Sequence, residues 1–175
     1  MAAAAETAET RFYGKYRATV VDNADPRRMA RLVLRVPDVL AGTATPWALP
    51  CLPVTGPTRG VFVLPAVGAN VWAEFEQGDP AYPIWVGGYW TSGDALPPAA
   101  LGQPAFQNIL LQTAAGNYVL LSDEPGPQGG IVLRGAGGAT ITVNQTGIRI
   151  DNGAGATISL TGPTVDINTG ALSVT

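Results

Sequence analysis

Residues 130–175 read GIVLRGAGGATITVNQTGIRIDNGAGATISLTGPTVDINTGALSVT. One small unit recurs here: an apolar residue, an outward residue, a second apolar residue, and a short break rich in Gly, Asn or Thr. The unit extends back to residue 109 and gives eight apolar pairs: Ile109/Leu111, Val119/Leu121, Ile131/Leu133, Ile141/Val143, Ile148/Ile150, Ile158/Leu160, Val165/Ile167 and Leu172/Val174. Successive pairs begin 7 to 12 residues apart, which is too short for helices and too regular for ordinary loops. The repeat therefore predicts short β-strands that follow one another around a narrow apolar axis, as in a β-helix or β-prism.

Each repeat supplies two inward side chains, and this small number limits what one chain can enclose. Strands that each contribute two apolar groups cannot close a core several residues wide. Identical chains that share one core would solve this problem, so we predict an intertwined oligomeric needle, with a trimer as the expected form. The predicted trimer core comprises Ile131, Leu133, Ile141, Val143, Ile148, Ile150, Ile158, Leu160, Val165 and Ile167. Such a needle is a mechanical part rather than a catalyst.

The sequence changes character near residues 95–105. Residues 92–100 read SGDALPPAA, which indicates a turn and linker because Pro and Gly interrupt both helices and strands. Beyond residue 100 the charged residues are few: Asp123, Glu124, Arg134, Arg149, Asp151 and Asp166. We therefore expect a flexible N-terminus at 1–10, a first domain at 11–95, a linker at 96–105, and a shaft with its tip at 106–175.

The first domain has the pattern of a small β-barrel. Alternating β-rich residues predict strands at 13–21 and 31–37, and further strands are expected near 60–64, 70–76 and 84–89. Five strands in fewer than about 100 residues, with almost no helical periodicity, are typical of an OB-like closed barrel. The predicted fold is all-β: an N-terminal OB-fold barrel followed by a C-terminal intertwined, triple-stranded β-helix.

Charge argues against several partners. The net charge of −3 and a pI near 4.8 make nucleic acid and anionic membranes weak candidates. The basic cluster Arg27, Arg28, Arg31 and Arg35 is interpreted as an exposed turn with the polar face of the next strand, the alternative being a subunit contact.

Catalytic and metal-binding residues are not predicted. The chain has one cysteine, Cys51, and no histidine, so the usual transition-metal ligand sets and an activated thiol are not expected. Glu74 and Glu76 are interpreted as solvated carboxylates, and Asp79, within Gly-Asp-Pro, as a cap of its own turn. No cofactor is expected. Without a signal-peptide pattern or a long apolar run, the protein is predicted to be synthesised in the cytoplasm.

Several motifs in the chain are those of a known family. In the first domain these are Asp25-Pro26, Arg35-Val36-Pro37, Pro46-Trp47-Ala48 and, most specific, Phe75 through GDPAYPIWVGGYW at 78–90. Their order resembles the OB domain of VgrG and phage baseplate assembly protein V spikes. Downstream, LQTAAGNYVLLSDEPG at 111–126 and IVLRG at 131–135 resemble the entry into those proteins' triple-stranded β-helix.

The resemblance implies a homotrimeric spike at the end of a contractile tail or injection-system tube. It implies attachment to tail hub or inner-tube proteins through the OB domain, and only transient contact with a target envelope that the spike punctures. The long N-terminal hub region of VgrG proteins is expected to be missing, and the lack of histidine excludes the iron-binding tip of some short phage spikes. By resemblance, the C-terminal residues Leu172, Val174 and Thr175 are expected to dock a PAAR-type tip protein.

Two other functions remain open from the residues alone. OB barrels bind single-stranded nucleic acid by stacking bases on aromatic side chains, although Lys and Arg are not concentrated among the aromatic residues of this chain. The available aromatic residues are Trp47, Trp72, Trp85, Trp90, Tyr82 and Tyr89. A glycan-binding fibre would need aromatic residues or clustered carboxylates along the repeats. Residues 122–175 contain no aromatic side chain.

Overall fold

The computed structural model describes residues 10–101 and 107–174, and the chain divides into two compact units, residues 1–91 and 92–175. Of the predicted flexible stretch 1–10, all but residue 10 lies outside the described residues, as do residues 102–105 of the predicted linker. Among the described residues, the helical elements are short: α1 (Pro37–Leu40), η1 (Glu76–Gly78), η2 (Gly93–Ala95) and η3 (Pro98–Ala100). The predicted all-β class is confirmed.

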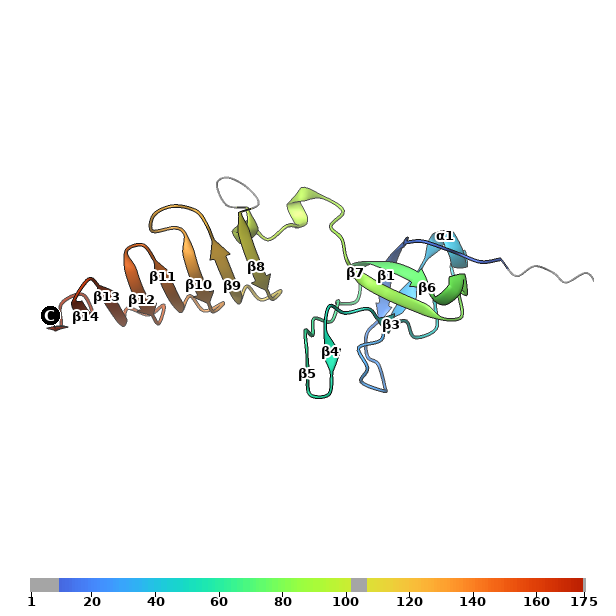
Figure 1. Ribbon diagram of the computed structural model, residues 1–175, viewed down its shortest axis with the longest axis horizontal. Coiled ribbons are helices and arrows are strands. Elements are labelled where there is room, and N and C mark those ends of the chain that lie inside the picture. Colours follow the sequence, from blue (N-terminus) through green and yellow to red (C-terminus); the bar gives the residue numbers. More distant parts are fainter. Residues whose placement is uncertain (1–9, 102–106, 175) are drawn as a thin grey trace, which may run out of the picture. The chain divides into compact units, whose positions relative to one another are not determined.

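The first unit is built on a curled five-stranded sheet in the order β2-β1-β6-β7-β3 (Figure 1). Its strands are β1 (Tyr16–Asp22), β2 (Val33–Arg35), β3 (Leu49–Pro50), β6 (Asn70–Phe75) and β7 (Pro83–Gly88). Neighbours are antiparallel except β3, which pairs with β7 in parallel. A separate hairpin joins β4 (Thr55–Gly56) to β5 (Arg59–Gly60).

The core of this unit follows from strand alternation. In β1 and β6 the buried residues alternate with exposed or half-buried ones, and the buried side chains meet Leu34 of β2 and Trp85 of β7. The buried core consists of Ala18, Val20, Leu32, Leu34, Val36, Ala48, Val71, Ala73, Phe75 and Trp85. The indole Nε1 of Trp85 donates to the carbonyl oxygen of Ala30 at 2.9 Å, so the ring's polar group is also satisfied.

The strand predicted at 60–64 is wrong. The structure pairs only Arg59–Gly60, as β5, and leaves Val61, Phe62 and Val63 exposed. The fifth strand of the sheet is instead β3, Leu49–Pro50. Its two residues, one of them a proline, are too short a run for an alternating pattern to reveal.

A buried carboxylate organises the turn between β1 and β2. Asp25 accepts backbone N–H groups of Arg27 at 2.9 Å and Met29 at 2.7 Å, and its Oδ1 lies 2.6 Å from Nη2 of Arg31. The Arg31 guanidinium holds the pKa of the Asp25 carboxyl well below its ordinary value, and the backbone donors act in the same direction. Arg31 also lies over the ring of Trp47, with Cζ 5.5 Å from the ring centroid. One residue of the predicted basic cluster is therefore a structural partner of this turn.

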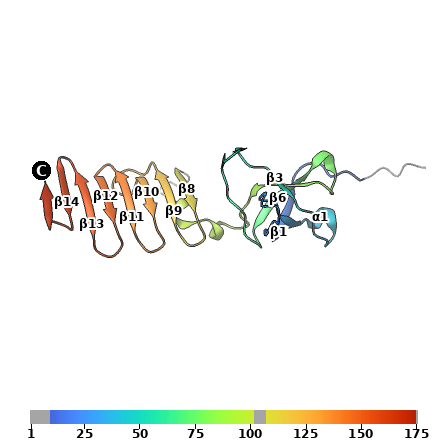
Figure 2. The ribbon, with the colours of Figure 1, turned by 90° about the horizontal axis from the view of Figure 1, so that it is seen from below.

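The second unit is an eight-stranded antiparallel sheet in which every strand pairs with its neighbours in sequence (Figures 1 and 2). Its strands are β8 (Asn108–Gln112), β9 (Tyr118–Ser122), β10 (Gly130–Arg134), β11 (Thr140–Asn144), β12 (Gly147–Asp151), β13 (Thr157–Thr161), β14 (Thr164–Ile167) and β15 (Leu172–Val174). Each of the eight apolar pairs lies in one of these strands. The strand predictions for the repeat are therefore confirmed.

Two glycines are required where strands of this sheet begin. Gly130 opens β10 with φ +93° and Gly147 opens β12 with φ +137°. A Cβ at either position would collide with the carbonyl oxygen of a neighbouring strand, that of Val143 or that of Leu160. Glycine permits both the backbone conformation and the close approach.

Candidate subunit interface

The apolar pairs of the second unit line up across the sheet in two rows. Row one contains Ile109, Leu121, Ile131, Val143, Ile148, Leu160, Val165 and Val174. Row two contains Leu111, Val119, Leu133, Ile141, Ile150, Ile158, Ile167 and Leu172. Residues two apart in a strand, and residues directly opposite in antiparallel neighbours, share a face. Both rows therefore lie on one face of the sheet, here called the apolar face.

The apolar face is open in a single chain. Thirteen of its sixteen side chains are 37–68% exposed, and the other three are half-buried. All ten residues predicted for the trimer core belong to these two rows. The structure thus brings them together on one surface, while their burial between subunits stays a prediction.

Besides Leu172 and Val174, the predicted tip contacts, four members of the rows lie outside the predicted core. Ile109 and Leu111 of β8, and Val119 and Leu121 of β9, continue both rows without a break in register. Their pair spacing is the same as in the later strands, so the repeat itself carried the signal. The candidate interface therefore extends beyond the predicted core at its N-terminal end, and the burial of all these residues between subunits stays a prediction.

The opposite face of the sheet changes from apolar to polar along the strands. Its central positions are Leu110, Leu120, Val132, Thr142, Arg149, Ser159 and Asp166 on successive strands. Leu120 is buried, and η3 lies against β8, where Asn108 Nδ2 donates to the carbonyl oxygen of Ala99 at 3.2 Å. From β11 onward the central residues are polar, which suits a face that meets water.

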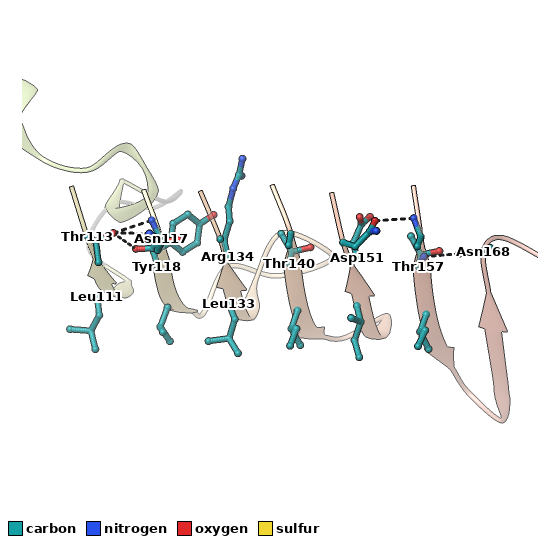
Figure 3. Close-up of a pocket in the computed structure, with 18 of the residues that line it drawn as sticks. Leu111, Thr113, Asn117, Tyr118, Leu133, Arg134, Thr140, Asp151, Thr157 and Asn168 are labelled. Atoms are coloured by element: carbon teal, nitrogen blue, oxygen red, sulfur yellow. Dashed lines mark hydrogen bonds between the residues drawn. The ribbon is translucent and has the colours of Figure 1, made fainter. Parts of the chain in front are cut away.

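Row two, from Leu111 to Ile167, also lines an open groove of about 900 Å³. Figure 3 shows Leu111 and Leu133 pointing to one side of the strands and Arg134 pointing to the other. The described residues that line the groove include one carboxylate, that of Asp151. Its Oδ2 accepts a hydrogen bond from Arg149 Nη2 at 2.9 Å. A backbone N–H from Gly153 and the Arg149 guanidinium lower the pKa of Asp151. The groove therefore offers an apolar contact surface with a single, already neutralised acid.

At each of the two ends of the strands, side chains connect one turn to the next. Asn117 Oδ1 accepts the backbone N–H of Ala136 at 3.0 Å, which links two successive turns on the groove side. On the other side, Asn144 Nδ2 donates to the carbonyl oxygen of Pro127 at 2.9 Å. These bonds within one chain hold the strands in register and keep the two rows straight.

Candidate acidic residues of the first unit have structural partners. Glu74 forms an ion pair with Lys15, and Asp79 Oδ1 accepts the backbone N–H of Ala81 at 2.9 Å. The predicted turn-capping role of Asp79 is confirmed. Across residues 10–101 and 107–174, no three His, Cys, Asp or Glu side chains gather as metal ligands would.

The aromatic residues of the first unit also contact one another. The rings of Trp72 and Tyr89 lie 4.7 Å apart between centroids, and Arg17 Cζ lies 5.7 Å from the Tyr89 ring centroid. The Tyr89 ring is thus occupied by neighbours of its own chain. This arrangement gives no specific support to base stacking at that residue.

Leu172 and Val174, the predicted tip contacts, are 55% and 58% exposed. Thr175, the third predicted contact, lies outside the described residues. None of the described helices is long and apolar enough to span a membrane.

Comparison with known families matches both units. Residues 16–90 match the family model of the type VI secretion system/phage-baseplate injector OB domain. Residues 108–173 match that of the phage baseplate V C-terminal trimerisation domain. Among curated proteins, none matches the chain.

Proposed function

This chain belongs to the spike family of phage baseplates and type VI secretion systems, and we propose that three copies of it form the central spike of such a particle. The family's domains place its members in a phage or injection particle as structural components. We propose that the trimer sits at the end of the inner tube and is driven through the target envelope when the sheath contracts. Its role is mechanical, without catalysis of its own.

The observation that carries this proposal is the open apolar face of the second unit. Isolated soluble proteins rarely expose a contiguous apolar patch that runs the length of a sheet. Full burial of such a side chain contributes on the order of 1.5–3 kcal/mol, so the fourteen row side chains of β8 to β14 supply a large driving force for association. A trimerisation-domain match over the same strands supports three copies as the number that closes the face.

The test is the mass of the purified full-length chain by light scattering. A homotrimer has three times the subunit mass of 18.0 kDa. A monomer with a folded, open sheet would contradict the proposal. A dimer would retain the shared core but reject the three-fold arrangement.

We propose a division of labour between the two units. The first unit attaches the spike to hub or inner-tube proteins, and the second forms the shaft. Most charged and all Trp residues lie in the first unit, where a specific partner contact would use them. Deletion of residues 140–175 should shorten the particle's spike while hub binding persists. Loss of hub binding in that variant, with the first unit still folded, would reject this division.

We further propose that Leu172 and Val174 contact a PAAR-type tip protein. Their exposure on β15 supports an apolar docking surface. Leu172→Ser with Val174→Ser should weaken binding of the tip protein while the trimer, held by the upstream rows, keeps its mass. Undiminished tip binding by this variant would contradict the docking site, and the spike role would stand.

A further inference from the structure

Among residues 10–91, the longest run of exposed apolar residues lies on a projecting hairpin. Residues 53–64, here called the arm, contain β4 and β5 and extend away from the curled sheet (Figures 1 and 2). Val54, Val61, Phe62 and Val63 of the arm are 51–70% exposed. Arg59 is its only charged residue.

The arm has the backbone pairing and the tight turn of a β-hairpin. Thr55 pairs with Gly60, and the backbone N–H of Val61 donates to the Val54 carbonyl oxygen at 3.2 Å. At the turn, Thr58 adopts a left-handed φ of 58°. A structured hairpin of this kind holds its apolar side chains in the solvent instead of folding them back onto the core.

Both ends of the arm are fixed to the first unit. Leu52 and Leu64 pack against its core cluster. Next to them, the Cys51 N–H donates to the Trp85 carbonyl oxygen at 2.9 Å, and Asn23 Nδ2 donates to the Pro65 carbonyl oxygen at 3.0 Å. An isolated two-stranded hairpin has little stability of its own, so an exposed apolar hairpin with a fixed base is suited to packing against another molecule.

We propose that the arm of each subunit packs against a neighbouring copy of this chain within the trimer. The inference rests on the proposed homotrimer and adds a second contact, made by the first unit. Val61, Phe62 and Val63 are all exposed, so they give the arm an apolar surface. Apolar contacts with few charges are typical of permanent subunit interfaces, whereas exchangeable partners use more polar surfaces.

The short segment between the two units favours a second copy of this chain, rather than a separate protein, as the partner that the arm contacts. The first unit ends near residue 91 and β8 begins at Asn108, so about 16 residues, or at most roughly 55 Å of chain, separate it from the trimerising sheet. Three first units held in this way meet at an effective concentration on the order of millimolar. In a three-fold ring each arm contacts a different surface of the next subunit, and three such contacts close the ring.

The test places a photo-cross-linker on the arm of the full-length protein. Phe62→p-benzoylphenylalanine, irradiated in the purified trimer, should give covalent species of two and three chains. The same substitution combined with Val61→Ser and Val63→Ser should keep the trimer mass and lose most of these cross-links. Val61, Phe62 and Val63 are exposed and are not among the side chains that pack against the core cluster, so we expect these changes to leave the subunit fold intact.

Trypsin provides a second readout at the bond after Arg59. In the trimer, cleavage there should be about tenfold slower than in the Val61→Ser, Val63→Ser variant, because a packed arm must open before it is cut. Val67→Ser, which removes a 60% exposed side chain outside the arm, is the matched control and should not change the rate.

The outcomes separate this inference from the proposed function. A protein that is monomeric by light scattering would contradict the trimer itself. A trimer that gives only single-chain products and is cut at Arg59 as fast as its arm variant would overturn the arm contact alone. Cross-links that require an added hub protein would likewise overturn it, since the occupant would then be another protein.

Discussion

The two units of this chain treat their apolar residues in opposite ways. The first closes its core within one subunit, where Leu32, Leu34 and Val36 have no exposed surface. In the second, the two rows of the apolar face remain exposed or half-buried. Among the described apolar residues of this unit, the buried one is Leu120, which lies on the opposite face. Both units use strands with a period of two. Alternation alone therefore does not reveal whether a core closes within one chain, and what decides it is whether another layer of the same chain covers the apolar face.

The largest expected effect comes from a charge on the apolar face. Ile150→Asp would bury three carboxylates close together in the trimer, and each buried ion costs several kcal/mol. We expect light scattering to show loss of the trimer. Thr142→Asp is the matched control, because it places the same charge on the opposite face beside Arg149. A trimer of normal mass for Ile150→Asp would mean that the other face is the inner one.

The converse change targets the closed core of the first unit. Leu34→Ala removes a fully buried side chain and should lower the stability of this unit by about 2–5 kcal/mol. All four Trp residues lie in the first unit, so denaturant unfolding followed by Trp fluorescence reports on it selectively. The trimer mass should persist. Dissociation of the trimer by this substitution would show that the two units do not hold their structures independently.

A smaller effect is expected at the turn that Asp25 organises. Because the folded-state pKa of Asp25 is lowered from its ordinary value of 3.8, its contribution to stability is present above that value and is lost as the pH falls below it. Asp25→Asn should therefore lower the denaturant midpoint of the Trp signal at pH 7. The difference from the unsubstituted protein should shrink as the pH is lowered below about 4. A difference that is constant with pH would assign the effect to packing instead of charge.

The smallest effect is expected from the ion pair between Asp151 and Arg149, whose position lies on the face opposite the two rows. The side chains of Arg149 and Asp151 are 50% and 27% exposed, and exposed pairs contribute little. Arg149→Gln should leave the trimer mass and its thermal midpoint within experimental error. A marked loss of trimer would place this face inside the assembly and reverse the assignment made for Ile150.

Local patterning explains how much of the fold was predictable. The second unit could be predicted strand by strand, because each pair is flanked by Gly, Asn or Thr breaks and pairs with its neighbour in sequence. In the first unit β3 was missed because two residues carry no period. The high β-propensity of Val-Phe-Val explains the strand predicted at 60–64, although no described strand pairs with residues 61–63.

The candidate interface was predictable for a different reason. Membership of the two rows follows from the repeat, and the rows continue from Ile131, where the predicted core begins, back to Ile109. The contacts of Asp25 with Arg31, and of Arg31 with Trp47, depend on how the chain folds back on itself. No spacing rule in the sequence points to them, so the basic cluster was interpreted as surface.

The continuous register of the two rows makes the length of the sheet an adjustable property. Removal of residues 145–161 would join Asn144 to the turn at Gly162 and bring Val165 opposite Val143, so that both rows continue unbroken. Two strands occupy about 10 Å along the sheet, and gain or loss of one hairpin would change its length by that step. Duplication or deletion of whole hairpins thus offers evolution a way to match a shaft to the thickness of the barrier it meets, without redesigning the surface that joins its subunits.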